Sequence, residues 1–234
     1  DYLADQIRQR SDALSALPAD EREERIATFV DWSVDNALAG ENGSATGEAT
    51  MHAHGPTVWQ PLTDPDDAAL LQDQLQQAGE VIARYPTAAD AVAGGYQQVT
   101  PYVPGIGAHY LNTSLIRHSG FDPAVPEMLL YNGNDPTSHI VGLSYATWGD
   151  EPTEGFAGPN DVWHQHPALC SIGTFVVGPD STPEDMCASI GGEKGVGGRL
   201  WMTHLWQVPG WESPWGLFSG ENPQINLVTT DVGR

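Results

Sequence analysis

Basic residues are scarce in this chain: nine lysines and arginines stand against 31 aspartates and glutamates in 234 residues, which gives a formal net charge of −22. Such an acidic surface repels the phosphates of nucleic acids and the headgroups of anionic lipids. We therefore expect neither nucleic acid nor an anionic membrane surface as a partner. The same charge attracts cations, and on its own it is also typical of a surface that only keeps a protein soluble.

Long apolar runs are missing as well. No stretch approaches the roughly 20 residues that cross a bilayer as a helix, so we expect no membrane span. The chain starts at Asp1 without a methionine, which favours a product processed from a longer precursor. We expect a protein exported from a bacterial cell, either secreted or held in the cell envelope.

Cysteine is limited to two residues, Cys170 and Cys187. In an exported protein, a disulfide between them would close a short loop and stabilise the fold by roughly 3 kcal/mol. Two free thiols are the less favoured alternative. The spacing is not Cys-x-x-Cys, so thioredoxin chemistry has no support. A Gly-x-Ser-x-Gly motif is also absent, so a hydrolase built on a nucleophile elbow is not indicated.

Helical and strand patterns occupy different parts of the chain. Apolar residues recur at helical spacing over about the first 95 residues. After Tyr96, short β-branched and aromatic runs alternate with Gly, Pro and Asn, and residues 132–136 suit a hairpin turn between 127–131 and 139–145. Helices followed by strands predict an α+β fold, with N-terminal helices before a mainly antiparallel β core that is barrel-like or sandwich-like.

We expect three segments: a helical extension at 1–40, a flexible linker at 41–58, and a main α+β domain at 59–234. The linker is rich in Gly, Ser, Thr and Ala and contains His52 and His54. These two histidines either capture metal loosely or belong to a plain disordered linker. The N-terminal helices either pack on the β core or bind a protein partner.

The placement of the eight histidines is the strongest chemical signal. His164 and His166 form a His-x-His pair, and residues two apart in a strand point to the same face. Two imidazoles on one face supply half of a zinc or copper site. Two surface histidines beside a turn are the alternative.

Two further histidines extend this pattern. His204 lies on an otherwise apolar strand face, so it is either hydrogen-bonded in the core or a metal ligand. His109 follows a segment rich in Pro and Gly, which allows the backbone to approach a bound group closely; a plain loop histidine is the alternative. The metal ligands that we predict are His109, His164, His166 and His204.

The predicted function is binding of a transition metal ion, copper or zinc, for storage, delivery or sequestration. An open coordination position would instead suit a mononuclear metalloenzyme, with Glu127 or Tyr110 assisting. Glu127 is otherwise expected at a solvated strand edge. The third alternative is a metal-free interaction domain whose histidines are ordinary core and surface residues.

Several longer motifs lie between residues 55 and 225. They include Gly107-Ala108-His109-Tyr110, Trp163-His164-Gln165-His166 with Cys170 following, and the segments 59–65, 85–90, 121–123, 128–131, 142–145 and 216–223. Together they resemble an uncharacterised family of exported bacterial proteins that is common in actinobacteria. Its members often carry a histidine-rich stretch where this chain has His52 and His54. The resemblance implies export and a metal, names no reaction, and does not extend to the helices before residue 40.

Overall fold

The computed structural model describes residues 1–41, 55–116 and 120–227. The chain divides into two compact units. The helical unit contains residues 1–50 and 166–198, and the sheet unit contains residues 51–165 and 199–234. Both units are discontinuous in sequence, whereas the predicted segments are continuous. Residues 42–54 of the predicted linker, with His52 and His54, lie outside the described residues, as does His118.

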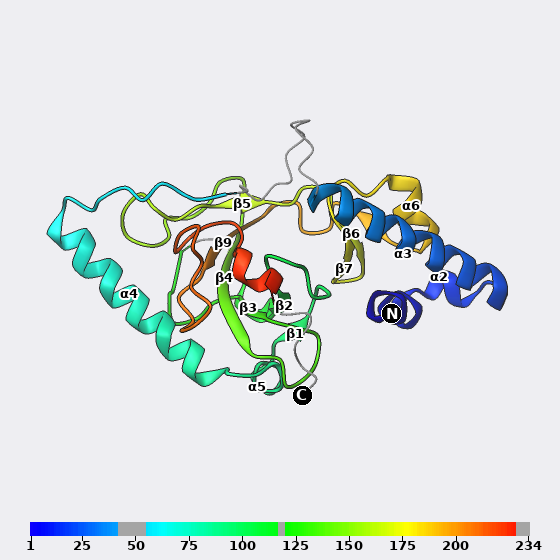
Figure 1. Ribbon diagram of the computed structural model, residues 1–234, viewed down its shortest axis with the longest axis horizontal. Helices are drawn as coiled ribbons and strands as arrows, with labels where there is room; N and C mark the ends of the chain where they lie inside the picture. The colour runs from blue at the N-terminus through cyan, green and yellow to red at the C-terminus, as the bar shows by residue number, and fades with distance from the viewer. Residues whose placement is uncertain (42–54, 117–119, 228–234) are drawn as a thin grey trace. The chain divides into compact units, whose positions relative to one another are not determined.

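The described residues of the helical unit form helices and a small antiparallel sheet (Figure 1). The helices are α1 (Tyr2–Arg10), α2 (Asp12–Ser15), α3 (Ala19–Glu41) and α6 (Glu184–Ser189). The sheet has the order β7-β6-β8, with β6 (Cys170–Ile172), β7 (Phe175–Gly178) and β8 (Glu193–Lys194). Its core buries Ile7 and Leu14 from the first helices, Ile26 and Phe29 from α3, and Phe175 from β7. The apolar faces of the helices and of the small sheet therefore form one shared core.

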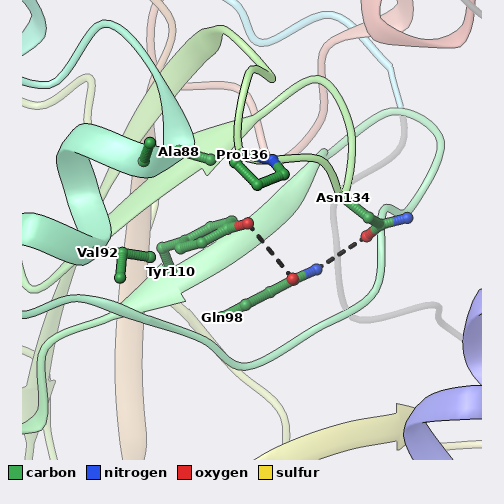
Figure 2. A pocket seen from close by; sticks show the side chains of 7 residues that line it. Ala88, Val92, Gln98, Tyr110, Asn134 and Pro136 are labelled. Atoms are coloured by element: carbon green, nitrogen blue, oxygen red, sulfur yellow. Dashed lines mark hydrogen bonds between the residues drawn. The ribbon is translucent and has the colours of Figure 1, made fainter.

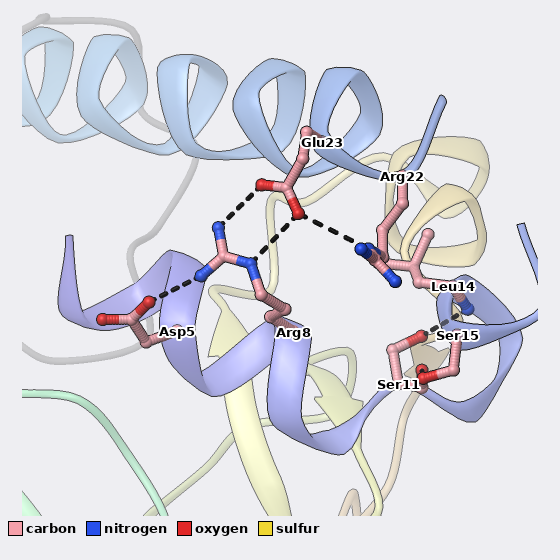
Figure 3. A network of polar contacts seen from close by, with 7 residues as sticks. All are labelled: Asp5, Arg8, Ser11, Leu14, Ser15, Arg22 and Glu23. Carbon is pink, nitrogen blue, oxygen red and sulfur yellow. Dashed lines mark hydrogen bonds and ion pairs between the residues drawn. The ribbon is translucent and has the colours of Figure 1, made fainter. Parts of the chain in front are cut away.

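Arg8 connects α1 to α3 (Figure 3). Its Nε and Nη2 donate to the Glu23 carboxylate at 3.1 and 2.8 Å, and its Nη1 donates to Asp5 at 2.6 Å. Ser11 caps α2 by accepting a hydrogen bond from the backbone N–H of Leu14. Because solvent screens exposed ion pairs and leaves them little net stabilisation, the apolar core rather than this network holds the helices together.

Cys170 and Cys187 form a disulfide that joins β6 to α6, as predicted. Gly192 lies against the bridge. A Cβ atom at this position would come within 2.8 and 2.9 Å of the two sulfur atoms. The absence of a side chain at Gly192 therefore leaves the room that the disulfide occupies.

In its described part, the sheet unit contains the helices α4 (Pro65–Arg84) and α5 (Ala88–Ala93) and a six-stranded antiparallel sheet (Figure 1). The strand order is β1-β2-β3-β4-β9-β5. The strands are β1 (Gln97–Gln98), β2 (Ala108–Leu111), β3 (Met128–Tyr131), β4 (Ile140–Trp148), β5 (His164–Gln165) and β9 (Leu200–Leu205). Two 3-10 helices are η1 (Thr113–Leu115) and η2 (Pro223–Leu227). The predicted α+β class with antiparallel pairing is confirmed, whereas the barrel alternative is wrong because the described strands of neither sheet close into a barrel.

Helix α4 covers one face of this sheet. Asp64 caps the helix by accepting from the N–H of Asp66, and a proline occupies the first helical turn, where no N–H partner is needed. The buried side of α4, with Leu71, Ala78 and Val81, shares a hydrophobic core with Tyr110, Leu129, Tyr131, Leu143, Tyr145 and Leu205. We call the sheet surface formed by these strand residues the α4 face. None of the helices in the described ranges combines the length and apolar character that a membrane crossing needs.

Candidate metal centre

Three of the predicted ligands lie on the sheet surface opposite the α4 face. In the strand register, His109 of β2 is paired with Leu130 of β3, and Ser144 of β4 is paired with His204 of β9. His164 of β5 is paired with Met202 of β9. Since side chains alternate along each strand and directly paired residues share a face, these side chains point away from α4. We call this surface the histidine face.

The three imidazoles lie close together there. The ring centroid of His204 is 5.1 Å from that of His164 and 5.8 Å from that of His109. In the sheet order, β3 and β4 lie between β2 and β9, and neighbouring strands are about 4.8 Å apart. The rings of His109 and His204 therefore lean towards each other over β3 and β4. His164 and His109 are each 9% exposed and His204 is 1% exposed.

The hydrogen bond at the Nδ1 of His204 fixes the proton on that ring. This nitrogen is 2.7 Å from the carbonyl oxygen of Gly220. A carbonyl oxygen can only accept, so Nδ1 carries the hydrogen and donates it. In a neutral ring, Nε2 then carries the lone pair, which is the form of histidine that binds a metal.

Trp206 supports His204 from the side. The two ring centroids are 5.3 Å apart, and the indole Nε1 donates to the carbonyl oxygen of Ser219. The indole lies over Gly142 of β4, where a Cβ atom would come within 2.7 Å of the ring. Gly142 therefore allows the tryptophan to lie across the sheet and to fix one side of the histidine cluster.

His109 is positioned through Thr100. The Thr100 hydroxyl accepts from the backbone N–H of His109 at 2.9 Å and lies 3.4 Å from its Nδ1. One side chain therefore contacts both the backbone and the ring of this residue. The arrangement limits the rotation of the imidazole on the histidine face.

The ring spacing matches the size of a metal site. A metal ion about 2.0–2.1 Å from each imidazole nitrogen, at tetrahedral angles, puts ring centroids about 5.2 Å apart. The distances of 5.1 and 5.8 Å are of this order. In the described part of the chain, however, no three His, Cys, Asp or Glu side chains are already set to hold one ion. Binding of one ion by all three imidazoles would therefore require these side chains to move.

His166 belongs to the helical unit, because the chain divides between Gln165 and His166, and strand β5 also ends at Gln165. Its Nδ1 is 2.7 Å from Oδ2 of Asp180, whose Oδ1 accepts from the N–H of Ala168 at 2.6 Å. Burial would raise the pKa of Asp180, but these hydrogen bonds and the charges of His166 and Lys194 outweigh it and lower that pKa. A shared site for His164 and His166 stays a prediction.

Two residues, Glu127 and Tyr110, are the suggested catalytic assistants. Glu127 is 3% exposed, so the expected solvated edge position is wrong, and its carboxylate accepts from the N–H of Ala146 at 2.9 Å. Burial first, and then the charge of Glu127, raise the pKa of Tyr145 on the α4 face. Tyr110 follows His109 in β2 and therefore points to the α4 face.

A hollow of about 380 Å³ lies beside Tyr110 (Figure 2). The Tyr110 hydroxyl donates to Oε1 of Gln98 at 3.3 Å, and Nε2 of Gln98 donates to Oδ1 of Asn134 at 2.8 Å. The remaining described lining residues are Ala88, Ala89, Val92 and Pro136, and none is charged. The polar side chains of Tyr110, Gln98 and Asn134 hydrogen-bond to one another. We therefore favour the histidine face over this hollow as the candidate site.

No family model, curated protein or solved structure matches this chain. The resemblance to exported actinobacterial proteins therefore stays a prediction, and the function has to be argued from the residues.

Proposed function

We propose that the sheet unit binds one transition metal ion, copper or zinc, through His109, His164 and His204. The observation that carries the proposal is the convergence of three imidazoles from three strands, with centroids 5.1 and 5.8 Å from the His204 ring. Imidazole nitrogens are common ligands of both metals. Histidines that serve only as core residues need a hydrogen-bond partner for each ring nitrogen, but nothing requires them to lie next to one another.

The surroundings of His204 support the same role. A ligating histidine almost always donates its other ring N–H to a carboxylate, carbonyl or water, and the carbonyl of Gly220 takes that place at 2.7 Å. The net charge of −22 would raise the local concentration of cations. We propose storage, delivery or sequestration of the ion as the role of this site, because none of the three needs a catalytic group.

We also propose that the protein works outside the cytoplasm. The disulfide between Cys170 and Cys187 supports this location, because structural disulfides persist in oxidising compartments and are rare in the cytosol. An enzyme is the second candidate function. Three histidine ligands would leave a fourth position for a reacting group.

Elemental mass spectrometry tests the proposed site. The protein would be purified without chelator or affinity tag, and compared with the variants His109→Ala, His164→Ala and His204→Asn. The matched control is His139→Ala, which changes an exposed histidine outside the site. We expect about one copper or zinc ion per chain in the wild type and the control, and loss of the ion in the three variants. An ion-free wild type that also gains no thermal stability from added copper or zinc would overturn the proposal.

A further inference from the structure

A buried hydroxyl group lies on the histidine face beside the proposed ligands. Ser144 is fully buried, and its Oγ has no hydrogen-bond partner in the described part of the chain. Buried hydroxyl groups are normally hydrogen-bonded, so one without a partner asks for an explanation. A ligand that supplies the missing hydrogen bond would be one.

The register locates this hydroxyl relative to the imidazoles. Ser144 is directly opposite His204 in the β4–β9 pair, and side chains paired in this way have Cβ atoms about 5 Å apart on the same face. Strand β4 also lies between β2 and β9 in the sheet order. The rings of His109 and His204 lean together over this part of the sheet, so Ser144 lies on a strand beneath them.

We propose that the Ser144 hydroxyl holds an exchangeable oxygen ligand, water or hydroxide, in the fourth position of the metal bound by His109, His164 and His204. This inference rests on the proposed function. Three imidazoles leave one position of a tetrahedral ion open, and the bound water of such an ion ionises near neutral pH. A serine hydroxyl accepts from water and donates to hydroxide, so Ser144 suits either form.

The experiment uses the full chain loaded with Co²⁺, whose visible spectrum reports on the ligand in the fourth position. Spectra are recorded against pH, and azide is titrated as a probe of that position. The variant is Ser144→Ala. The matched control is Thr203→Val, because Thr203 carries an equally buried hydroxyl without a described partner and points to the other face, one residue before His204. Metal content is measured in every sample.

With the metal retained, Ser144→Ala is expected to make ionisation of the bound water about tenfold less favourable, since one hydrogen bond to the charged hydroxide is lost. Azide affinity should change by a similar factor, and Thr203→Val should match the wild type. An unchanged pH profile in metal-loaded Ser144→Ala would overturn the role of Ser144 and leave the metal site standing. A wild-type spectrum that responds to neither pH nor azide would exclude an exchangeable ligand. A wild type that binds no ion would overturn both proposals.

Discussion

The Nδ1 of His204 and the carbonyl oxygen of Gly220 are 2.7 Å apart. This contact gives one ring nitrogen a structural role and leaves the other for the proposed metal. The Nδ1 side of the ring contacts the loop that follows β9, whereas Nε2 is the nitrogen that we propose as the metal ligand. A structural histidine needs the first contact, and a ligand needs both. Substitutions that remove one nitrogen at a time can therefore tell these roles apart.

His204→Asn keeps an N–H donor at about the position of Nδ1 and removes Nε2, while His204→Ala removes both. We expect both variants to lose the ion. His204→Ala should in addition unfold with a free energy about 1–3 kcal/mol lower than His204→Asn, because the carbonyl of Gly220 loses its buried partner. Urea denaturation of the metal-free proteins measures the difference. Equal stabilities would mean that the Gly220 contact does not stabilise the fold.

Trp206 should report copper binding directly. Its ring centroid is 5.3 Å from that of His204, close enough for bound Cu²⁺ to quench the indole fluorescence. We expect one equivalent of Cu²⁺ to quench part of the emission and Zn²⁺ to have little effect. In Trp206→Phe the quenched fraction should fall sharply, although seven other tryptophans remain, one fewer than the eight in the chain. The same fractional quenching in that variant would locate the copper elsewhere.

Part of the candidate site could be predicted from local patterns. The apolar alternation around His204 predicts a strand, and the same alternation puts His164 and His204 on one face once the strands pair. The contribution of His109 depends on the lean of its ring across β3 and β4, which no local pattern encodes. The Gly220 carbonyl is a backbone group in a loop, so only the folded chain reveals it as the partner of His204.

The division into two units could not be predicted, for a related reason. Sequence analysis predicts a helical extension at 1–40 and leaves open what it packs against; in the structure, Phe29 of α3 shares a core with Phe175 of β7, almost 150 residues later. An amphipathic stripe predicts that a helix buries one face, and does not indicate against which segment. The disulfide was predictable because two cysteines allow only one pairing.

Gly192 and the disulfide should depend on each other. A Cβ atom at Gly192 would lie 2.8 and 2.9 Å from the sulfur atoms, so Gly192→Ala should destabilise the oxidised protein by about 1–3 kcal/mol through overpacking. In the background Cys170→Ala/Cys187→Ala the same change should cost less, since the sulfur atoms are gone and only the contact at 3.0 Å to the backbone oxygen of residue 187 remains. A double-mutant cycle with guanidinium denaturation measures this coupling. Additive effects would show that the contact carries no strain.

The contact between His166 and Asp180 predicts how stability depends on pH. The pKa of Asp180 is lowered in the folded protein, because the hydrogen bonds from His166 and Ala168 and the charges of His166 and Lys194 outweigh burial. An unfolded aspartate titrates at about 3.9, so the unfolded chain takes up the proton first as the pH falls. The stabilisation by the Asp180 carboxylate is therefore fully present above about pH 4 and is lost as the pH falls through the lower folded pKa.

Asp180→Asn removes this titration. We expect the variant to be less stable than the wild type at pH 7, and the difference in unfolding free energy to narrow as the pH falls below about 4. Urea denaturation across this range measures it, with His166→Asn as the variant that removes the partner instead of the acid. In His166→Asn the pKa of Asp180 should rise towards its ordinary value, so less stability should be lost as the pH falls. A difference between the wild type and Asp180→Asn that stays constant with pH would mean that the carboxylate acts only through its shape, and that its charge adds nothing to the fold.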